Sequence, residues 1–143
     1  MSLARLFALA FGIVYLLTGL LSFVRPLTDA GGGGLLVGSR THLVGLFATN
    51  WFHNVAHLVV GVLALAAAGR HDTAVLAARI LGIVLVGVFV AGIFTGNLFG
   101  VMPLNWPDNL LHLLSALLAL GIGFSEVGER RVARSRPLAP SHR

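Results

Sequence analysis

The chain has 143 residues, of which 57% are hydrophobic and only 10% are charged. A soluble chain of this length could not bury so much apolar surface, so the composition excludes an ordinary water-soluble domain and predicts a protein of the lipid bilayer. The absence of cysteine excludes disulfides, thiolate catalysis and cysteine metal sites. The net charge of +5 does not predict nucleic-acid binding, because half of the arginines lie in the last fourteen residues, where membrane topology and anionic lipid explain them.

The first expected membrane helix spans residues 3–24, which are apolar apart from Arg5 and small hydroxyl side chains. About 20 helical residues cross a hydrocarbon core of about 30 Å. A cleavable signal peptide is the alternative. It fits less well, because the apolar run exceeds the usual core of roughly 7–15 residues and no clean A-x-A cleavage site follows.

Residues 25–49 form a long connection. Arg25-Pro26 ends the first helix, because proline cannot continue it. Gly31–Gly34 is a flexible tract, and Leu35–Ala48 is apolar but interrupted by charged and polar residues. The sequence leaves open whether this last stretch is an interfacial helix or a partly ordered loop.

Three further membrane helices are expected at residues 50–68, 73–96 and 106–124. Asn50 and Asn105 are suitable N-caps for the first and last of these. The helix at 73–96 carries glycines that favour close helix contact and leave a homodimer open: Gly82, Gly87, Gly92 and Gly96. The folded domain should therefore span residues 1–125, and the Arg-rich tail 126–143 should be disordered.

A sixteen-residue stretch occurs twice. Residues 50–65 are NWFHNVAHLVVGVLAL and residues 105–120 are NWPDNLLHLLSALLAL, matched without a gap at an offset of 55 positions. Gly12–Gly19 likewise resembles Gly82–Phe89. The chain is thus predicted to consist of two repeats, 5–68 and 79–124. The expected fold is all-α: an integral membrane four-helix bundle made by parallel duplication, with a pseudo-twofold axis along the membrane normal.

Arginine placement predicts the orientation. With four spans, both termini and the turn near Arg70 share one side, which holds eight of the ten arginines. The positive-inside rule then places both termini in the cytoplasm, in a multi-pass protein of the cytoplasmic (inner) membrane. Trp51 and Trp106 should lie at the outer interface as aromatic anchors.

Polar side chains recur at equivalent places in both halves. His53 and His57 are four residues apart and share a helix face, as do Asp108 and His112. If the two faces meet, three histidines and one aspartate converge, which would suit a transition metal. Haem b held by His57 and His112 is a second option.

A structural role explains the same residues. Asn50 and Asn105 would cap helices, Asp108 would favour the helix dipole, and the remaining polar groups would tie the two halves together. In that case Asn50, Asn54, Asn105 and Asn109 form a structural polar cluster, and the histidines bond to asparagines or to each other. A role in proton or solute movement also stays open, because ionisable groups inside a membrane are often functional.

The two histidine motifs resemble a known family. HNVAHLVVGVLAL after GLFATNW, and LNWPDNLLHLLSALLAL near the end, are similar to the bacterial four-helix membrane family catalogued as domain of unknown function 4383. The similarity covers about Arg5 to Phe124. It implies an integral protein of the cytoplasmic membrane and brings no activity, substrate or ligand.

Two functions follow as expectations. The first is a non-enzymatic membrane scaffold or accessory protein, whose partners are the lipid bilayer and a membrane protein or a second copy of the chain. The alternative is a metal- or haem b-binding protein using His53, His57, Asp108 and His112. No serine–histidine–aspartate order or phosphate-binding loop points to an enzyme.

Overall fold

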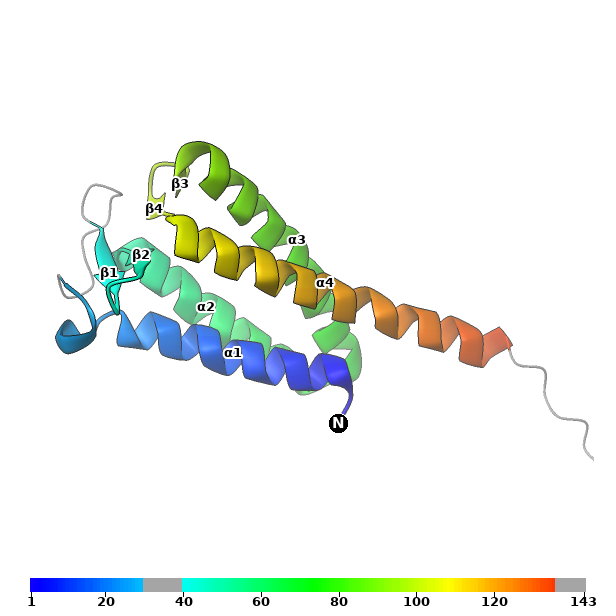
Figure 1. Cartoon of the computed structure of the whole chain (residues 1–143). Helices are drawn as coiled ribbons and strands as arrows, with labels where there is room; N and C mark the ends of the chain where they lie inside the picture. Colours follow the sequence, from blue (N-terminus) through cyan, green and yellow to red (C-terminus); the bar gives the residue numbers. More distant parts are fainter. Residues whose placement is uncertain (30–39, 136–143) are drawn as a thin grey trace, which may run out of the picture.

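The fold is known from a computed structural model, which describes residues 1–29 and 40–135, with side chains described as far as residue 125. Long helices run side by side, and two small hairpins lie together at the end opposite the N-terminus (Figure 1). The elements are α1 (Leu3–Leu21), the 3-10 helix η1 (Arg25–Leu27), β1 (Thr41–Leu43), β2 (Phe47–Thr49), α2 (Trp51–Ala67), α3 (His71–Thr95), β3 (Asn97–Leu98), β4 (Met102–Pro103) and α4 (Trp106–Ser135).

The helices confirm the predicted all-α membrane fold. Helices α1, α3 and the Trp106–Ser125 part of α4 are long and apolar enough to cross a bilayer. Helix α2 is also apolar but has 17 residues. At 1.5 Å per residue it is about 26 Å long, slightly less than a typical hydrocarbon core.

Small residues fill the inside of the bundle and large apolar residues cover its outside. Ala74, Ala78, Ala116 and Ala119 are fully buried. The outer surface instead carries large side chains, among them Leu63, Ile83, Val84, Leu117 and Leu118, each more than half exposed. Lipid tails are as apolar as leucine, so this arrangement suits a bilayer, where close backbone packing holds helices together.

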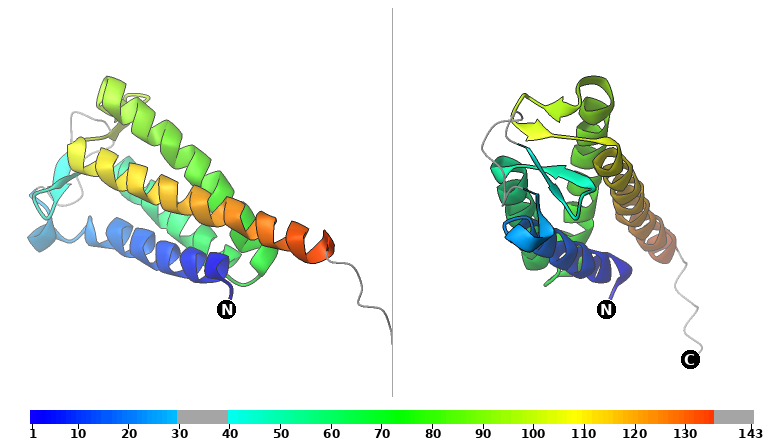
Figure 2. Two further views of the ribbon diagram at one scale, coloured as in Figure 1. Left: turned by 45° about the vertical axis from the view of Figure 1, so that its right-hand side comes forward. Right: turned by 60° about the vertical axis from the view of Figure 1, so that its left-hand side comes forward.

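The bundle is built from two antiparallel helix pairs, α1 with α2 and α3 with α4 (Figure 2). Glycine permits the close approach in each pair. A Cβ added at Gly12 would lie 2.8 Å from the backbone nitrogen of Leu65, and one at Gly82 would lie 2.6 Å from Cγ of Leu120. Neither position has room for a side chain.

Half-buried arginines link the helices of each pair at the end that holds the N-terminus. Arg5 of α1 donates from Nε to the carbonyl of Ala68 at 2.9 Å. Arg79 of α3 donates from Nε to the carbonyl of Gly123 at 2.7 Å. Both bonds satisfy a carbonyl at or near the end of the neighbouring helix, so each arginine is tied to protein.

Neither β-hairpin was expected. Strands β1 and β2 pair in the antiparallel sense, with Leu43 opposite Phe47, and β3 pairs with β4, with Leu98 opposite Met102. The interfacial helix or partly ordered loop considered for Leu35–Ala48 is therefore wrong from Thr41 onward, where the chain forms a hairpin. The connection 97–104 likewise forms a hairpin, through β3 and β4. Each hairpin turns through a non-glycine residue at positive φ followed by glycine: Val44-Gly45 and Phe99-Gly100. Two consecutive residues at positive φ fit a tight hairpin turn.

Several boundaries differ from the sequence prediction. Helix α1 ends at Leu21, ahead of the predicted residue 24, and α3 begins at His71. Helix α4 continues through residues 126–135, beyond its predicted end at residue 124. This part contains helix-favouring Glu and Arg residues, and no proline occurs before Pro137. The disorder expected for the tail stays a prediction. Residues 136–143 and the Gly31–Gly34 tract lie outside the described residues.

Candidate functional site

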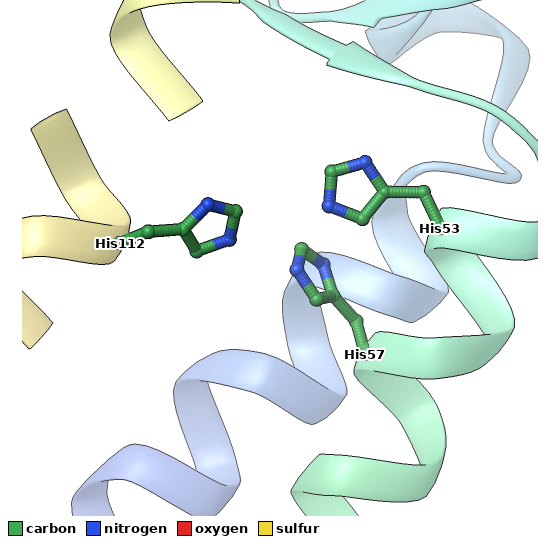
Figure 3. Close-up of side chains that lie close together, drawn as sticks. All are labelled: His53, His57 and His112. Atoms are coloured by element: carbon green, nitrogen blue, oxygen red, sulfur yellow. The ribbon is translucent and has the colours of Figure 1, made fainter. Parts of the chain in front are cut away.

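Three histidine side chains from two helices converge at the hairpin end of the bundle. His53 and His57 lie one turn apart on α2, and His112 lies in the second turn of α4. The ring centroids are 4.5 Å apart for His53 and His57, 6.1 Å for His53 and His112, and 6.4 Å for His57 and His112. In Figure 3 the His112 ring reaches from α4 toward the two rings of α2. We call these three residues the histidine cluster.

A backbone bond orients the ring of His53, which is completely buried. Its Nδ1 atom lies 3.1 Å from the carbonyl oxygen of Ala48. Because a carbonyl only accepts, Nδ1 carries the proton, and the lone pair of the neutral ring is on Nε2. Nε2 is buried and has no hydrogen-bond partner among the described residues. Histidines that bind metals are commonly oriented by such a bond from their other nitrogen.

His57 and His112 also present buried nitrogen atoms. Nδ1 of each ring lacks a hydrogen-bond partner within the described ranges. One nitrogen from each of the three rings lies within 4.8 Å of the other two. A buried polar atom left without a partner costs about 1–3 kcal/mol. One such atom in each of three neighbouring rings therefore calls for an explanation beyond packing.

Asp108, the fourth predicted ligand, does not join the histidine cluster. Its Oδ2 atom accepts hydrogen bonds from the backbone N–H groups of Ala48 and Asn105, each at 3.0 Å. The first bond crosses from α4 to strand β2, and the second caps the start of α4. The carboxylate therefore serves the backbone, and the cluster within the described residues consists of three imidazoles alone.

Two asparagines tie the hairpins together in a reciprocal way. Asn50 donates from Nδ2 to the carbonyl of Val101, and Asn105 donates from Nδ2 to the carbonyl of Leu46, both at 2.6 Å. Each asparagine also caps its own helix. Oδ1 of Asn50 accepts from the His53 N–H at 2.9 Å, and Oδ1 of Asn105 accepts from the Asp108 N–H at 3.1 Å. Each half of the chain thus holds the hairpin of the other half.

The other two asparagines pack against glycines of the neighbouring helix. Asn54 is fully buried, and a Cβ on Gly19 would lie 2.8 Å from the backbone carbonyl oxygen of Asn54. Asn109 is 4% exposed, and a Cβ on Gly92 would collide with its side-chain amide. Neither amide belongs to the histidine cluster. Trp51 and Trp106 are exposed at the first residues of α2 and α4, at the hairpin end of the bundle.

The histidine cluster has the donor set of a transition-metal site. Zinc binds histidine nitrogen at about 2.0–2.1 Å, so two nitrogens of a tetrahedral site lie about 3.3 Å apart. Nitrogens within 4.8 Å of one another reach this spacing by modest ring rotation. Three protein ligands would leave one position for water or a small molecule. The residues present fit a metal ion.

Sequence patterns had not singled out Ala48 or Tyr15 as part of this site. Ala48 bonds both His53 and Asp108 through its backbone, which no sequence pattern reveals. Tyr15 packs edge-on against His57, with ring centroids 4.9 Å apart. The sequence does hold a signal that could have pointed to Tyr15, because aromatic residues recur every four positions on one face of α1: Phe7, Phe11 and Tyr15.

Comparison with known proteins agrees with the resemblance seen in the sequence. The family described as domain of unknown function (DUF4383) matches residues 5–125. This range includes α1 except its first two residues, all of α2 and α3, α4 as far as residue 125, and every residue of the histidine cluster. No curated protein and no solved structure matches the chain at a significant level. Since the match covers most of the sequence, the chain belongs to the DUF4383 family.

Proposed function

We propose that this membrane protein binds one transition-metal ion through His53, His57 and His112, in a redox or sensing role. The observation that carries the proposal is the convergence of two buried imidazoles and one half-buried imidazole, with one nitrogen of each ring within 4.8 Å of the other two. Each ring also holds a buried nitrogen without a hydrogen-bond partner among the described residues. Imidazole suits zinc, copper, iron and nickel. Bond formation with a metal would satisfy all three nitrogens and offset the cost of burying them.

Metal analysis tests this function directly. The protein is purified in detergent, incubated with Zn²⁺ or with Cu⁺ under reducing conditions, dialysed, and measured by plasma mass spectrometry. We expect about one ion per chain. The His57→Ala/His112→Ala double variant should retain none, and the His42→Ala/His71→Ala variant is the matched control, because both of those residues lie outside the cluster. Loss of metal from both variants alike, or no stoichiometric metal in the parent protein, would refute the proposal.

A bis-histidine haem b is less well supported than a metal ion. His57 and His112 lie on facing helices, as haem ligands would. However, the His53 ring lies 4.5 Å from His57 and 6.1 Å from His112. It therefore takes up space beside the two rings that a porphyrin between them would need. An absorption spectrum without a Soret band would remove this alternative.

A non-enzymatic scaffold or accessory role is the second candidate function. The observation that favours it is the reciprocal pair of bonds from Asn50 to Val101 and from Asn105 to Leu46, which builds a rigid cap at one end of the bundle. Membrane-protein partners of such a scaffold would be recovered by crosslinking in the native membrane. A metal-free protein destabilised but otherwise unchanged by histidine substitution would favour this role over metal binding.

We also propose that the bundle arose by parallel duplication of a hairpin-and-helix unit. Equivalent features recur at the offset of 55 found in the sequence. The turn residues Val44 and Phe99 share positive φ, and the acceptor carbonyls Leu46 and Val101 bond to Asn105 and Asn50. A pseudo-twofold axis through the hairpin end would relate the two halves and make His57 and His112 equivalent residues.

A further inference from the structure

A cavity adjoins the histidine cluster on the side facing α1 and α4. Its volume is about 250 Å³. Residues of α1 and α4 line it, together with His57 of α2. The lining residues are Phe7, Ala10, Phe11, Val14, Tyr15, Thr18, His57, Leu111, Ser115 and Leu118.

Aromatic rings form a continuous surface along this cavity. The rings of Phe11 and Tyr15 are stacked with centroids 4.0 Å apart, and Tyr15 meets His57 edge-on at 4.9 Å. Such a wall offers stacking and edge contacts to a flat ring. The surface leads from the α1 side of the cavity to the histidine cluster.

The mouth of the cavity faces the lipid. Val14, Leu111 and Leu118 line it and are 56%, 41% and 57% exposed. Ala10 is exposed as well. These residues lie within helices that are long and apolar enough to span the bilayer. A molecule entering here would come from the hydrocarbon phase and not from water.

A few polar side chains line the otherwise apolar cavity. The hydroxyl of Tyr15 lies near that of Ser115 but is buried without a hydrogen-bond partner among the described residues, and both residues line the cavity together with His57. A lipid acyl chain would fill the apolar mouth but would offer nothing to these groups. Leaving the Tyr15 hydroxyl without an acceptor costs free energy that a ligand oxygen would recover.

We propose that the cavity binds a bilayer-soluble single-ring quinone, with a ring oxygen accepting from Tyr15 and Ser115 beside His57. The volume suits one substituted ring, near the lower limit of about 300 Å³ for small-molecule sites, and any apolar tail leaves through the mouth. This inference rests on the proposed function, because it names the small molecule that meets the metal held by His57.

Fluorine NMR tests the proposal, because Tyr15 is the only tyrosine in the chain. Protein labelled with 3-fluorotyrosine in phosphatidylcholine nanodiscs gives one resonance, which is followed during titration with decylubiquinone. We expect a saturable shift. Ala10→Phe fills the mouth and should abolish it. Ser115→Ala should weaken binding by about 3- to 10-fold through loss of one hydrogen bond.

The matched control is Ala56→Phe, which adds the same ring in a different surface groove, lined by residues of α2. It should leave the shift unchanged. Decane serves as the acyl-chain probe, and an equally saturable shift with decane would overturn the proposal in favour of lipid. No saturable shift with either probe, in protein shown by mass spectrometry to hold its metal, would overturn it as well. Absence of metal in the same sample would instead refute the proposed function, so the two failures are distinguishable.

Discussion

At the scale of single residues, spacing predicted the histidines better than the carboxylate. A separation of four residues places His53 and His57 on one face of α2, whatever else the chain does. The hydrogen-bond partner of the Asp108 carboxylate could not be predicted, because it is the N–H of Ala48, which lies in a hairpin that the sequence did not reveal. A buried carboxylate accepts hydrogen bonds from nearby N–H groups, and only the fold shows which N–H groups are near Asp108. That a metal binds the three histidines stays a prediction.

Substitution of Asp108 separates its structural role from the histidine cluster. Asp108→Ala should destabilise the protein by about 1–3 kcal/mol, because the buried N–H of Ala48 loses its acceptor. Metal content should stay at the parent value, since Asp108 lies outside the cluster. Thermal unfolding in detergent and metal analysis measure the two effects. Loss of metal from folded Asp108→Ala protein would show that the carboxylate is a ligand after all.

Gly92 is the residue at which α3 makes room for the amide of Asn109. Gly92→Ala should destabilise the fold by about 1–3 kcal/mol, because the new Cβ would collide with that amide and force it to move. Gly87 lies on the same helix with open space around it. Gly87→Ala should therefore be neutral or slightly stabilising, by up to about 1 kcal/mol from helix propensity.

Thermal unfolding of both glycine variants in one detergent supplies the comparison. Equal midpoints for Gly92→Ala and Gly87→Ala would contradict the close contact at Gly92.

The same contacts bear on oligomerisation, because Gly82 and Gly92 pack against Leu120 and Asn109 of the same chain. The glycine face predicted for a homodimer is thus largely used within the bundle.

At the scale of elements, helices were predictable and hairpins were not. A run of about 20 apolar residues needs no other information to be identified as a membrane helix. Strands of two or three residues are too short to show alternation, and their turns place Val44 and Phe99 at positive φ, where sequence rules expect glycine or asparagine. The bonds across the hairpins, from Asn50 and Asn105, therefore remained invisible as well.

Acidification should loosen the first hairpin. Asp29, just before the undescribed residues 30–39, accepts from the hydroxyl of Thr41 and from the N–H of His42 at 2.8 Å, and its carboxylate pairs with the His42 ring at 2.9 Å. These bonds hold the pKa of Asp29 well below its usual range, and the bond from Thr41 contributes most. The carboxyl is protonated near pH 4 in the unfolded chain and only at lower pH in the folded protein.

The sign of the effect follows from this shift. Stabilisation by Asp29 is fully present above about pH 4 and is lost as the pH falls toward the folded pKa. Asp29→Asn should thus be less stable than the parent at about pH 6, and the difference should shrink as the pH falls toward about 2. Unfolding midpoints across this range measure it. A difference that grows on acidification would contradict the assignment.

At the scale of the whole molecule, the N-terminus, the described end of α4 and the turn between α2 and α3 lie away from the hairpins (Figure 2). The arginines Arg5, Arg70 and Arg79 lie in or beside this end of the bundle. By the positive-inside rule we propose that it faces the cytoplasm, with the hairpins, the two tryptophans and the histidine cluster near the outer face of the cytoplasmic membrane.

Reporter fusions test this orientation. Green fluorescent protein fused to the C-terminus should fluoresce in bacterial cells, whereas alkaline phosphatase at the same position should be inactive, because it needs an oxidising compartment. Alkaline phosphatase inserted at Gly45, in the turn of the first hairpin, should be active. The reverse pattern would place the cluster on the cytoplasmic side.

Pro103 bears on why position 53 carries a histidine where position 108 carries an aspartate. It stands in β4 where Ala48 stands in β2, and it is a backbone neighbour of His53, as Ala48 is of Asp108. Proline has no N–H to give, so a carboxylate at position 53 would lack the bond that Asp108 has. One imino acid thus makes the two positions chemically unequal: a carboxylate is stabilised by a backbone N–H at position 108, and position 53 is left to an imidazole.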